Sequence, residues 1–203
     1  MLYVLTLDEM KDALGIKDVE DDSRVTRLLE GLQGRAAQYC HRTFLYSSGI
    51  EEFFDGDQQW LLVKSCPIDT VASVQVSDAA LWDGTTLLDP SLYRINKARG
   101  RLMYGDGAHS YFQTQHNWPR GSQNIRVVYA GGLLNADGSA APNADSDDID
   151  ALRRGMHIQA NFEWRNRQNL GQQAVSAQGV NVTLARAELL PEVKQIFDQL
   201  KRF

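Results

Sequence analysis

The spacing of apolar residues predicts two helices near the N-terminus. Thr6 and Glu9 are spaced so that each side chain can bond the other's backbone amide, which marks the start of a helix over residues 7–14. A second helix begins at Asp22 or Ser23. Its apolar residues recur every three or four positions, as on one face of a helix, and they are Val25, Leu28, Leu29, Leu32, Ala36 and Tyr39.

Two glycines interrupt the pattern of this second helix. Gly31 and Gly34 each weaken a helix by up to about 1 kcal/mol relative to Ala. A glycine also permits close approach of another backbone. We therefore expect a neighbouring element to lie against the second helix at these two positions.

The pattern changes to short β-forming runs between residues 49 and 132. Runs such as "TVASVQV" and "NIRVVYAGG" alternate or stay apolar, and turn signals separate them. Asp83-Gly84 is expected to form a hairpin turn. Because no helical pattern lies between the runs, the strands should pair in antiparallel fashion as a small sandwich or barrel.

Helical periodicity returns after residues 133–148, which are rich in Gly, Pro, Asn and Asp and are expected to form an exposed loop. The long helix that follows starts near Asp147 or Asp148 and runs to about residue 166. One stripe contains Ile149, Leu152, Met156, Ala160 and Trp164, while Ile158 and Phe162 lie nearly opposite. A helix that is apolar on two sides needs two partners, so we predict that Ile158 and Phe162 form an intersubunit surface.

The C-terminal end of the chain predicts a last, short helix. Residues 166–179 bear little to bury and indicate a mobile loop, and "VNVTLA" is expected to form one strand. Pro191 stands at a plausible first helical position. The helix must dock on its own domain or on a neighbouring chain, and periodicity does not separate the two; its apolar stripe is Val193, Ile196, Phe197, Leu200 and Phe203.

These elements define an α+β fold in two parts. Residues 1–48 and 133–203 form a helical bundle with a C-terminal docking helix, and residues 49–132 form a β-rich insertion. The 203 residues suffice for a sizeable core, and the 43% hydrophobic and 23% charged residues are typical of a globular protein. No apolar run approaches the roughly 20 residues of a membrane helix, so we expect synthesis in a cytoplasm and no membrane partner.

The net charge and the cysteine content argue against nucleic-acid binding, disulfide bonds and zinc sites. The formal net charge of −5 argues against binding to a phosphate backbone, although like-charge repulsion would let DNA slide past without sticking. Cys40 and Cys66 are the only thiols and are expected to be buried, without a disulfide or zinc cluster.

The sequence "QYCHRTF" places a thiol beside an imidazole, but it does not predict a catalytic pair. Cys40 and His41 are adjacent on a helix and therefore point about 100° apart. They also lie at a helix C-terminus, whose negative dipole disfavours a thiolate. Cys40 is interpreted as a buried structural thiol, and His41 and Arg42 as cations that favour the last turn.

Other chemical signals are weak. Asp106, His109 and His116 share a polar stretch, yet two surface histidines explain it better than a metal site. The sequence contains no phosphate loop or nucleophile elbow, so we predict no cofactor and no enzymatic activity. Aromatic and basic residues interleave in "YRINKARGRLMYG"; base stacking is one explanation, and a half-buried strand is the favoured one.

The order of several segments resembles the head-tail connector, or adaptor, proteins of tailed bacteriophages, in their longer form with a β-rich insertion. The segments are "LTLDEMKDALGI", "DVEDDSRVTRLLEGLQGRAAQYCHRTF", "CPIDTVASVQV", "DPSLYRI", "NWP" before "IRVVYAGG", and "FEWRNR". They span nearly the whole chain. The start of the long helix, "DSDDIDALRRGMH", departs from the family, whose members often have a Pro-led start and an Ala-rich run there.

The resemblance implies a virion protein of the neck, between capsid and tail, that forms a ring of about a dozen copies below the portal. Such a ring extends the channel for double-stranded DNA and offers a surface to the next neck, stopper or tail protein. The resemblance further implies that the helix from Val193 to Phe203 contacts the portal and that residues 166–179 contact neighbours. The alternatives are another neck component, such as a stopper or tail-completion protein, or a small phage hydrolase using Cys40 or the histidine-bearing loop.

Overall fold

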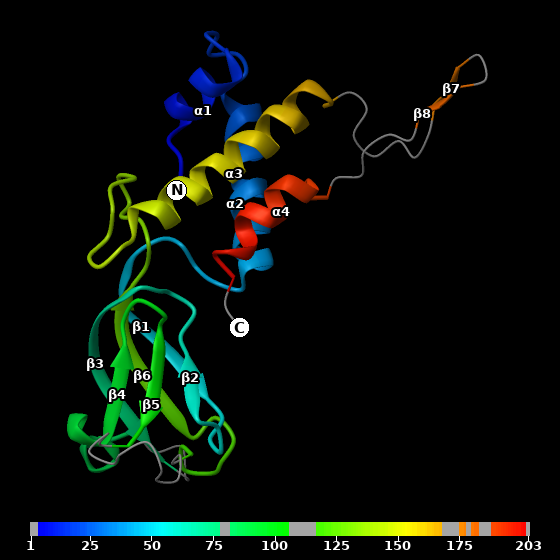
Figure 1. Ribbon diagram of the computed structural model, residues 1–203. Helices are drawn as coiled ribbons and strands as arrows, with labels where there is room; N and C mark the ends of the chain where they lie inside the picture. Colours follow the sequence, from blue (N-terminus) through cyan, green and yellow to red (C-terminus); the bar gives the residue numbers. More distant parts are fainter. Residues whose placement is uncertain are drawn as a thin grey trace. The chain divides into compact units, whose positions relative to one another are not determined.

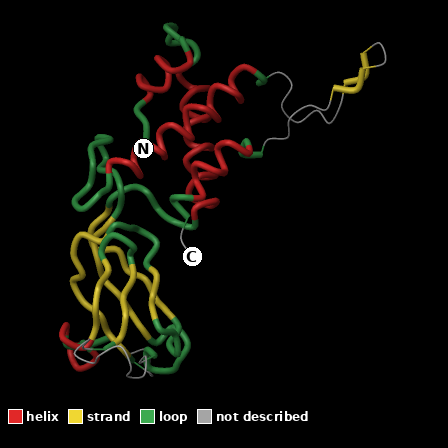
Figure 2. Tube along the Cα trace, viewed as in Figure 1, coloured by secondary structure: helices red, strands yellow, loops and turns green. Residues whose placement is uncertain are grey.

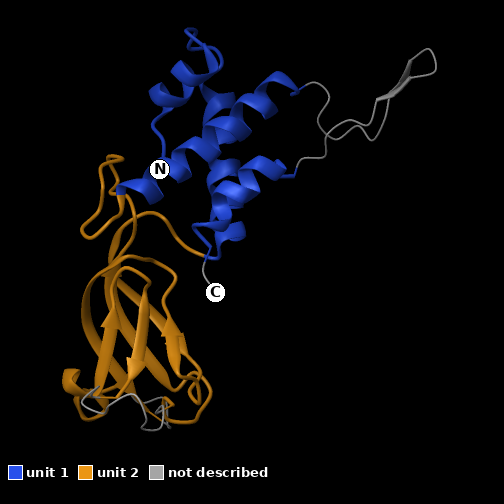
Figure 3. Ribbon diagram, in the orientation of Figure 1, with its two compact units in different colours: residues 1–41, 146–203 blue, residues 42–145 orange. Residues whose placement is uncertain are grey.

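The computed structural model describes residues 4–77, 82–105, 117–167, 175–177, 180–182 and 188–201 (Figures 1 and 2). The chain divides into two compact units (Figure 3): unit 1 comprises residues 1–41 and 146–203, and unit 2 comprises residues 42–145. Unit 1 is helical and unit 2 is built from strands, which makes the fold α+β. None of the helices in the described ranges is long and apolar enough to span a membrane.

The described residues of unit 1 form four helices, α1 (Leu7–Leu14), α2 (Asp22–Cys40), α3 (Ser146–Arg165) and α4 (Pro191–Asp198). Helix α3 contacts each of the other three (Figure 1). The expected signals delimit these helices: a capping box opens α1, acidic residues occupy the first turn of α3, and a proline opens α4. In the same unit, the strands β7 (Val175–Ala177) and β8 (Val180–Val182) pair in antiparallel fashion.

The apolar stripe of α2 faces the interior of unit 1 as its periodicity predicts. Val25, Leu29, Leu32, Ala36 and Cys40 are buried, whereas Leu28 and Tyr39 are half-buried. The expectation for the two glycines of this helix is wrong. A Cβ atom added at either position would meet nothing within 4 Å, so no other backbone approaches there.

The described residues of unit 2 form two antiparallel three-stranded sheets, which overlap in the view of Figure 1. The first has the order β1-β6-β3, formed by Ser47–Phe54, Ile125–Gly131 and Ile68–Val76. The second has the order β2-β5-β4, formed by Trp60–Leu62, Arg101–Tyr104 and Tyr93–Asn96.

The two sheets of unit 2 enclose one apolar core between them. The alternation of side chains along each strand directs every second residue inward. The buried members are Leu61, Val63, Ile68, Val74, Tyr93, Leu102, Trp118, Ile125, Val127 and Tyr129. The described strands form two separate sheets, so the insertion is a small sandwich and not a closed barrel.

The core of unit 2 contains one tyrosine whose hydroxyl group is hydrogen-bonded on both sides, Tyr129. Tyr129 donates to Glu52 and accepts a hydrogen bond from the backbone amide of Ser65 at 3.0 Å. Burial and the hydrogen bond to Glu52 raise the pKa of the Tyr129 phenol. Both hydrogen-bonding capacities of the hydroxyl are thus used, as a buried polar group requires.

Two local expectations for unit 2 are wrong. Asp83-Gly84 does not form a hairpin turn: the Asp83 carboxylate accepts from the Thr85 amide at 2.9 Å and caps a short 3₁₀ helix, η1 (Gly84–Thr86). An aspartate capping a turn competes with the tighter hairpin geometry. The second wrong expectation is that residues 133–148, which follow β6, form an exposed loop, because part of this segment is buried.

The beginning of that loop packs into unit 2. Leu133 and Leu134 are fully buried and their amides donate to the Phe44 carbonyl, at 2.7 and 3.0 Å. Ala141 is buried too, and its amide donates to the Leu133 carbonyl. These contacts keep residues 133–145 with unit 2. The chain therefore passes from one unit to the other after His41 and after Asp145. The sequence pattern, by contrast, placed these borders after residues 48 and 132.

Candidate interaction surfaces

The α4 helix docks in unit 1 through a close contact with α3. Gly155 of α3 lies against the Phe197 ring, since a Cβ atom added at Gly155 would come within 2.3 Å of a ring carbon. Phe197 is itself fully buried. The absence of a side chain at Gly155 therefore provides the space that the ring fills.

The predicted portal-docking residues of α4 fall into three groups. Val193, Phe197 and Leu200 are buried in unit 1, Ile196 is half-buried, and Phe203 lies outside the described residues. The bulk of the stripe thus meets its own bundle in the free chain, which is one of the two partners that periodicity left open. Contact with a portal stays a prediction.

A buried amide fixes the chain where it enters α4. Gln159 of α3 is 1% exposed. Its Nε2 donates to the Glu188 carbonyl at 3.1 Å and to Glu163 Oε1 at 2.7 Å, and its Oε1 accepts from the Leu190 amide at 2.9 Å. The Leu190 amide precedes the first turn of α4, where no intrahelical acceptor exists. Gln159 therefore satisfies this amide and sets the position of the helix start.

Glu163 connects this clamp to α2. One guanidinium nitrogen of Arg35 lies 2.7 Å from Glu163 Oε1 and 2.8 Å from its Oε2. Glu163 also accepts from Gln159, so the carboxylate joins α2, α3 and the entry of α4. We call Arg35, Gln159 and Glu163 the polar clamp. The sequence offered one signal for it, two polar residues four positions apart beside the α3 stripe, but this spacing equally fits a solvent-facing edge.

A second polar contact holds the end of α4. The Tyr39 hydroxyl donates to Asp198 Oδ1 at 2.8 Å, and the Lys201 ammonium lies 2.8 Å from the same carboxylate and 3.9 Å from the Tyr39 ring centre. The hydrogen bonds from Lys201 and Tyr39 lower the pKa of Asp198, and the one to Asp198 raises the pKa of Lys201. These groups are at the surface, so they contribute little to stability.

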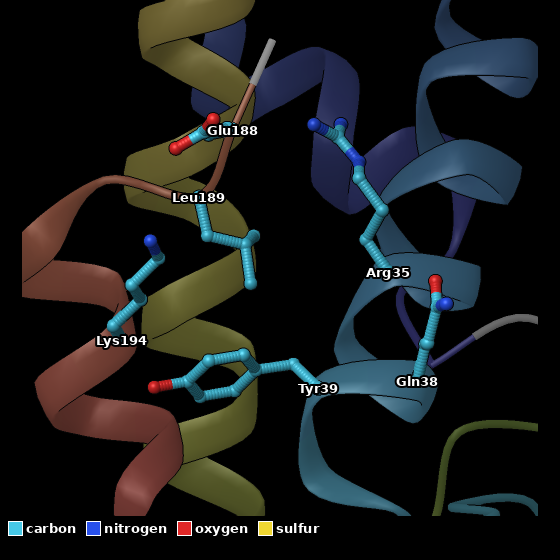
Figure 4. A pocket seen from close by; sticks show the side chains of 6 residues that line it. All are labelled: Arg35, Gln38, Tyr39, Glu188, Leu189 and Lys194. Atoms are coloured by element: carbon cyan, nitrogen blue, oxygen red, sulfur yellow. The ribbon is translucent and has the colours of Figure 1, made fainter. Parts of the chain in front are cut away.

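Two hollows open on unit 1 beside these contacts. The first, of about 310 Å³, lies between α2 and the start of α4, with side chains of both signs of charge around it (Figure 4); its lining residues are Arg35, Gln38, Tyr39, Glu188, Leu189 and Lys194. The second, of about 250 Å³, lies at one end of α2 and α3 and is lined by Arg24, Leu28, Glu163, Trp164 and Arg167.

The two predicted intersubunit residues of α3 are each half-buried. Ile158 and Phe162 are neither enclosed like Leu152 and Ala160 nor fully exposed. Partial exposure of an apolar residue on a helix is compatible with a further contact, and the intersubunit role stays a prediction.

Cys40, His41 and Arg42 of the segment "QYCHRTF" differ in burial and in the contacts that they make. Cys40 is fully buried as expected, and its thiol lies 3.6 Å from the Phe197 carbonyl. His41 ends α2 in the left-handed conformation, with φ 51°, and is exposed. The interpretation of Arg42 is wrong: its side chain is buried in unit 2, where it donates to the Cys66 carbonyl at 2.6 Å and lies over the Phe44 ring.

The weak metal candidates Asp106, His109 and His116 lie outside the described residues. Within the described ranges, no group of three or more His, Cys, Asp or Glu side chains is arranged to hold a metal ion. Cys66, the other thiol, is buried and free.

Comparisons with known proteins identify a shared fold. No protein-family profile and no curated protein matches the sequence. Among solved structures, a chain from the neck of an empty gene transfer agent (GTA) particle computed with C6 symmetry aligns with a TM-score of 0.56 at 14% identity, covering 98% of this chain and 90% of that one. The chain therefore has the fold of that neck protein along nearly its whole length.

Two further chains give weaker superpositions. One is from the virion of a native GTA particle, with a TM-score of 0.49 at 17% identity, covering 98% of this chain and 90% of that one. The other is from the neck of a native GTA particle computed with C12 symmetry, with a TM-score of 0.49 at 16% identity, covering 100% and 96%.

Proposed function

We propose that the protein is a non-enzymatic structural subunit of the neck of a tailed-phage-like particle. The observation that carries the proposal is the fold shared with a chain of a GTA neck, which extends over 98% of this protein. The resemblance of its ordered sequence segments to head-tail connectors supports the same class independently. Because a fold alone does not fix a function, the role is tested by its partners.

Within the neck, we propose the adaptor position. The subunit forms a ring of about a dozen copies below the portal, by head-to-tail contacts that close on themselves. The ring extends the DNA channel and presents a surface to the next neck or tail protein. The net charge of −5 supports a conduit, since a like-charged wall does not retain a polyanion.

The C-terminal helix is the proposed portal contact. Since Val193, Phe197 and Leu200 are used inside unit 1, α4 meets the portal as a docked helix, through Ile196 and its outward side. Substituting Ile196 with Asp then weakens portal binding without unfolding the subunit. Portal binding at wild-type strength would remove α4 from the interface.

The half-buried face of α3 provides a test of the ring. Phe162→Asp leaves the subunit folded and prevents ring formation if Phe162 lies between subunits, because an exposed apolar contact contributes little to the monomer. Leu152→Asp is the matched control: Leu152 is fully buried on the same helix, and an unpaired buried charge unfolds the protein. Melting curves of both variants decide, and loss of the folded state in Phe162→Asp would assign Phe162 to the core.

Binding to isolated particle parts separates the adaptor from the alternatives. The tagged protein is incubated with isolated portal and, separately, with isolated tails. An adaptor is retained by the portal, whereas a stopper or tail-completion protein is retained by tails alone. The hydrolase alternative uses Cys40, whose thiol is buried, or the histidine-bearing loop. Particle assembly that proceeds normally with Cys40→Ser, and with both His109 and His116 changed to Ala, would count against it.

A further inference from the structure

The outer face of the second sheet of unit 2 combines apolar and basic side chains. Trp60, Met103 and Arg94 are paired across β2, β5 and β4, so their side chains form one row. Leu62, Arg101 and Asn96 form the next row on the same side. We call these six residues the basic sheet face.

The basic sheet face is accessible. Trp60, on the edge strand β2, is 42% exposed, and Met103, on the central strand β5, is 38% exposed, which leaves two large apolar side chains open to solvent. The Arg101 guanidinium lies 5.3 Å from the centre of the Trp60 ring and therefore presents a cation at the apolar centre. Trp, Met and Arg are enriched at protein interfaces, and none of the six positions is a carboxylate.

Unit 1 carries a segment of complementary composition, residues 17–22, which we call the acidic loop. Val19 in its centre is 76% exposed, more than any other large apolar residue in the described ranges. Asp18 and Glu20 flank it and are exposed. The other two carboxylates are engaged inside the unit, Asp21 with Arg24 and Asp22 with Lys11.

Val19 stands in a closed turn. The Val19 carbonyl accepts the Asp22 amide at 3.2 Å, which closes the turn that precedes α2. The turn thus displays one apolar side chain between two exposed carboxylates. On the basic sheet face, Met103 neighbours Arg94 across the strands and Arg101 along β5. The two surfaces match in both apolar centre and charge sign.

We propose that the acidic loop of one copy of this chain docks on the basic sheet face of the next copy, with Val19 against Trp60 and Met103 and with Asp18 and Glu20 facing Arg94 and Arg101. Two different patches on one chain generate a head-to-tail interface, the kind that closes into a ring. The inference rests on the proposed ring function, because it names a contact between neighbouring subunits of that ring, in addition to the one proposed for α3.

Charge reversal tests the contact. The loop variant carries Asp18→Lys and Glu20→Lys, and the face variant carries Arg94→Glu and Arg101→Glu. Each variant alone places like charges opposite each other and loses ring formation on isolated portal, seen by native mass spectrometry. An equimolar mixture restores rings in which the two variants alternate, since every junction then pairs opposite charges; a chain with all four changes also assembles.

A matched control excludes an effect of net charge. Asp12→Lys with Glu30→Lys changes the charge of unit 1 by the same amount at two other exposed positions, and it leaves assembly intact. Melting curves of every variant show that it is folded. If the double face change unfolds unit 2, Arg94→Glu paired with Glu20→Lys repeats the design with one contact.

Disulfide trapping reports the contact without a portal. A mixture of Val19→Cys and Met103→Cys proteins forms a cross-linked heterodimer under mild oxidation, while neither protein alone does; Cys40 and Cys66 are buried and do not interfere. Rings of the loop and face variants that equal wild type, together with no cross-link, overturn the docking but leave the neck function standing. A cross-link without any ring on the portal supports the docking and contradicts the adaptor position. Loss of DNA binding by the face variant alone, with the loop variant unaffected, assigns the face to nucleic acid.

Discussion

The two units of the protein bury their interiors in different ways. Unit 2 encloses ten mainly apolar side chains between two sheets, with the Tyr129 hydroxyl fully hydrogen-bonded. Unit 1 joins α2, α3 and α4 through the polar clamp of Arg35, Gln159 and Glu163 as well as through apolar contacts. Apolar burial is non-directional, whereas hydrogen bonds require one geometry. Buried polar groups occur in both units, as Arg42 and Asn124 of unit 2 show. In unit 1 the hydrogen bonds of the polar clamp also fix where α4 begins.

The largest effect is expected in the apolar core of unit 2. Leu102→Ala removes a fully buried side chain of β5 and lowers the free energy of unfolding by about 2–5 kcal/mol. The matched control is Met103→Ala, the next residue on the same strand with an exposed side chain, which costs about 0.5 kcal/mol or less. Urea unfolding of both variants measures the difference, and equal costs would mean that the sandwich core is not packed as described.

Glycine substitutions distinguish the contact of α4 from an open helix surface. Gly155→Ala pushes a methyl group into the Phe197 ring and lowers stability by about 1–3 kcal/mol, because overpacking displaces the docked helix. Gly34→Ala, in the open middle of α2, raises stability by up to about 1 kcal/mol through helix propensity. Thermal unfolding gives the two shifts, and the prediction fails if they have the same sign.

The polar clamp is expected to contribute through the groups that it satisfies. Gln159→Leu keeps a similar size but leaves the Leu190 amide and the Glu188 carbonyl without their partner, which costs about 1–3 kcal/mol. Hydrogen exchange locates the effect: the amides of α4 exchange faster, while those of β5 and β6 are unchanged. Uniform acceleration throughout both units would show that α4 is not separately positioned by the clamp.

The smallest effect concerns pH. Burial lowers the pKa of His157 on α3, with Arg153 adding to the effect and Glu9 opposing it. The folded state thus favours the neutral ring, so this stability is present above the ordinary histidine pKa near 6.5 and is lost as the pH falls through the lower folded value. Melting of unit 1 between pH 7.5 and 5 shows a steeper loss in wild type than in His157→Gln. Parallel curves would exclude the linkage.

The helices could be predicted because their signals are local. Thr6 and Glu9 cap α1, and the stripe of α2 faces the interior, both from spacing alone. The sandwich could be predicted only as a class, since β1 pairs with β6 across some 70 residues of chain and no local pattern encodes such a partner. The hairpin turn predicted at Asp83-Gly84 is absent because the Asp83 side chain caps a 3₁₀ helix there instead.

The interaction surfaces were harder to predict for a related reason. Periodicity identified the stripe of α4 as a docking face but not its partner, which in the free chain is largely α2 and α3. No residue next to Gln159 or Arg42 in the sequence marks either side chain as buried, and only the fold buries them. The basic sheet face needed the register of three strands before its two rows became visible.

Imaging the protein together with its portal shows whether it forms a ring in the neck. Purified protein is mixed with isolated portal and examined by electron microscopy. The account predicts a closed ring of this chain on one end of the portal, coaxial with the DNA channel. A protein that stays monomeric and never binds the portal under these conditions would contradict it.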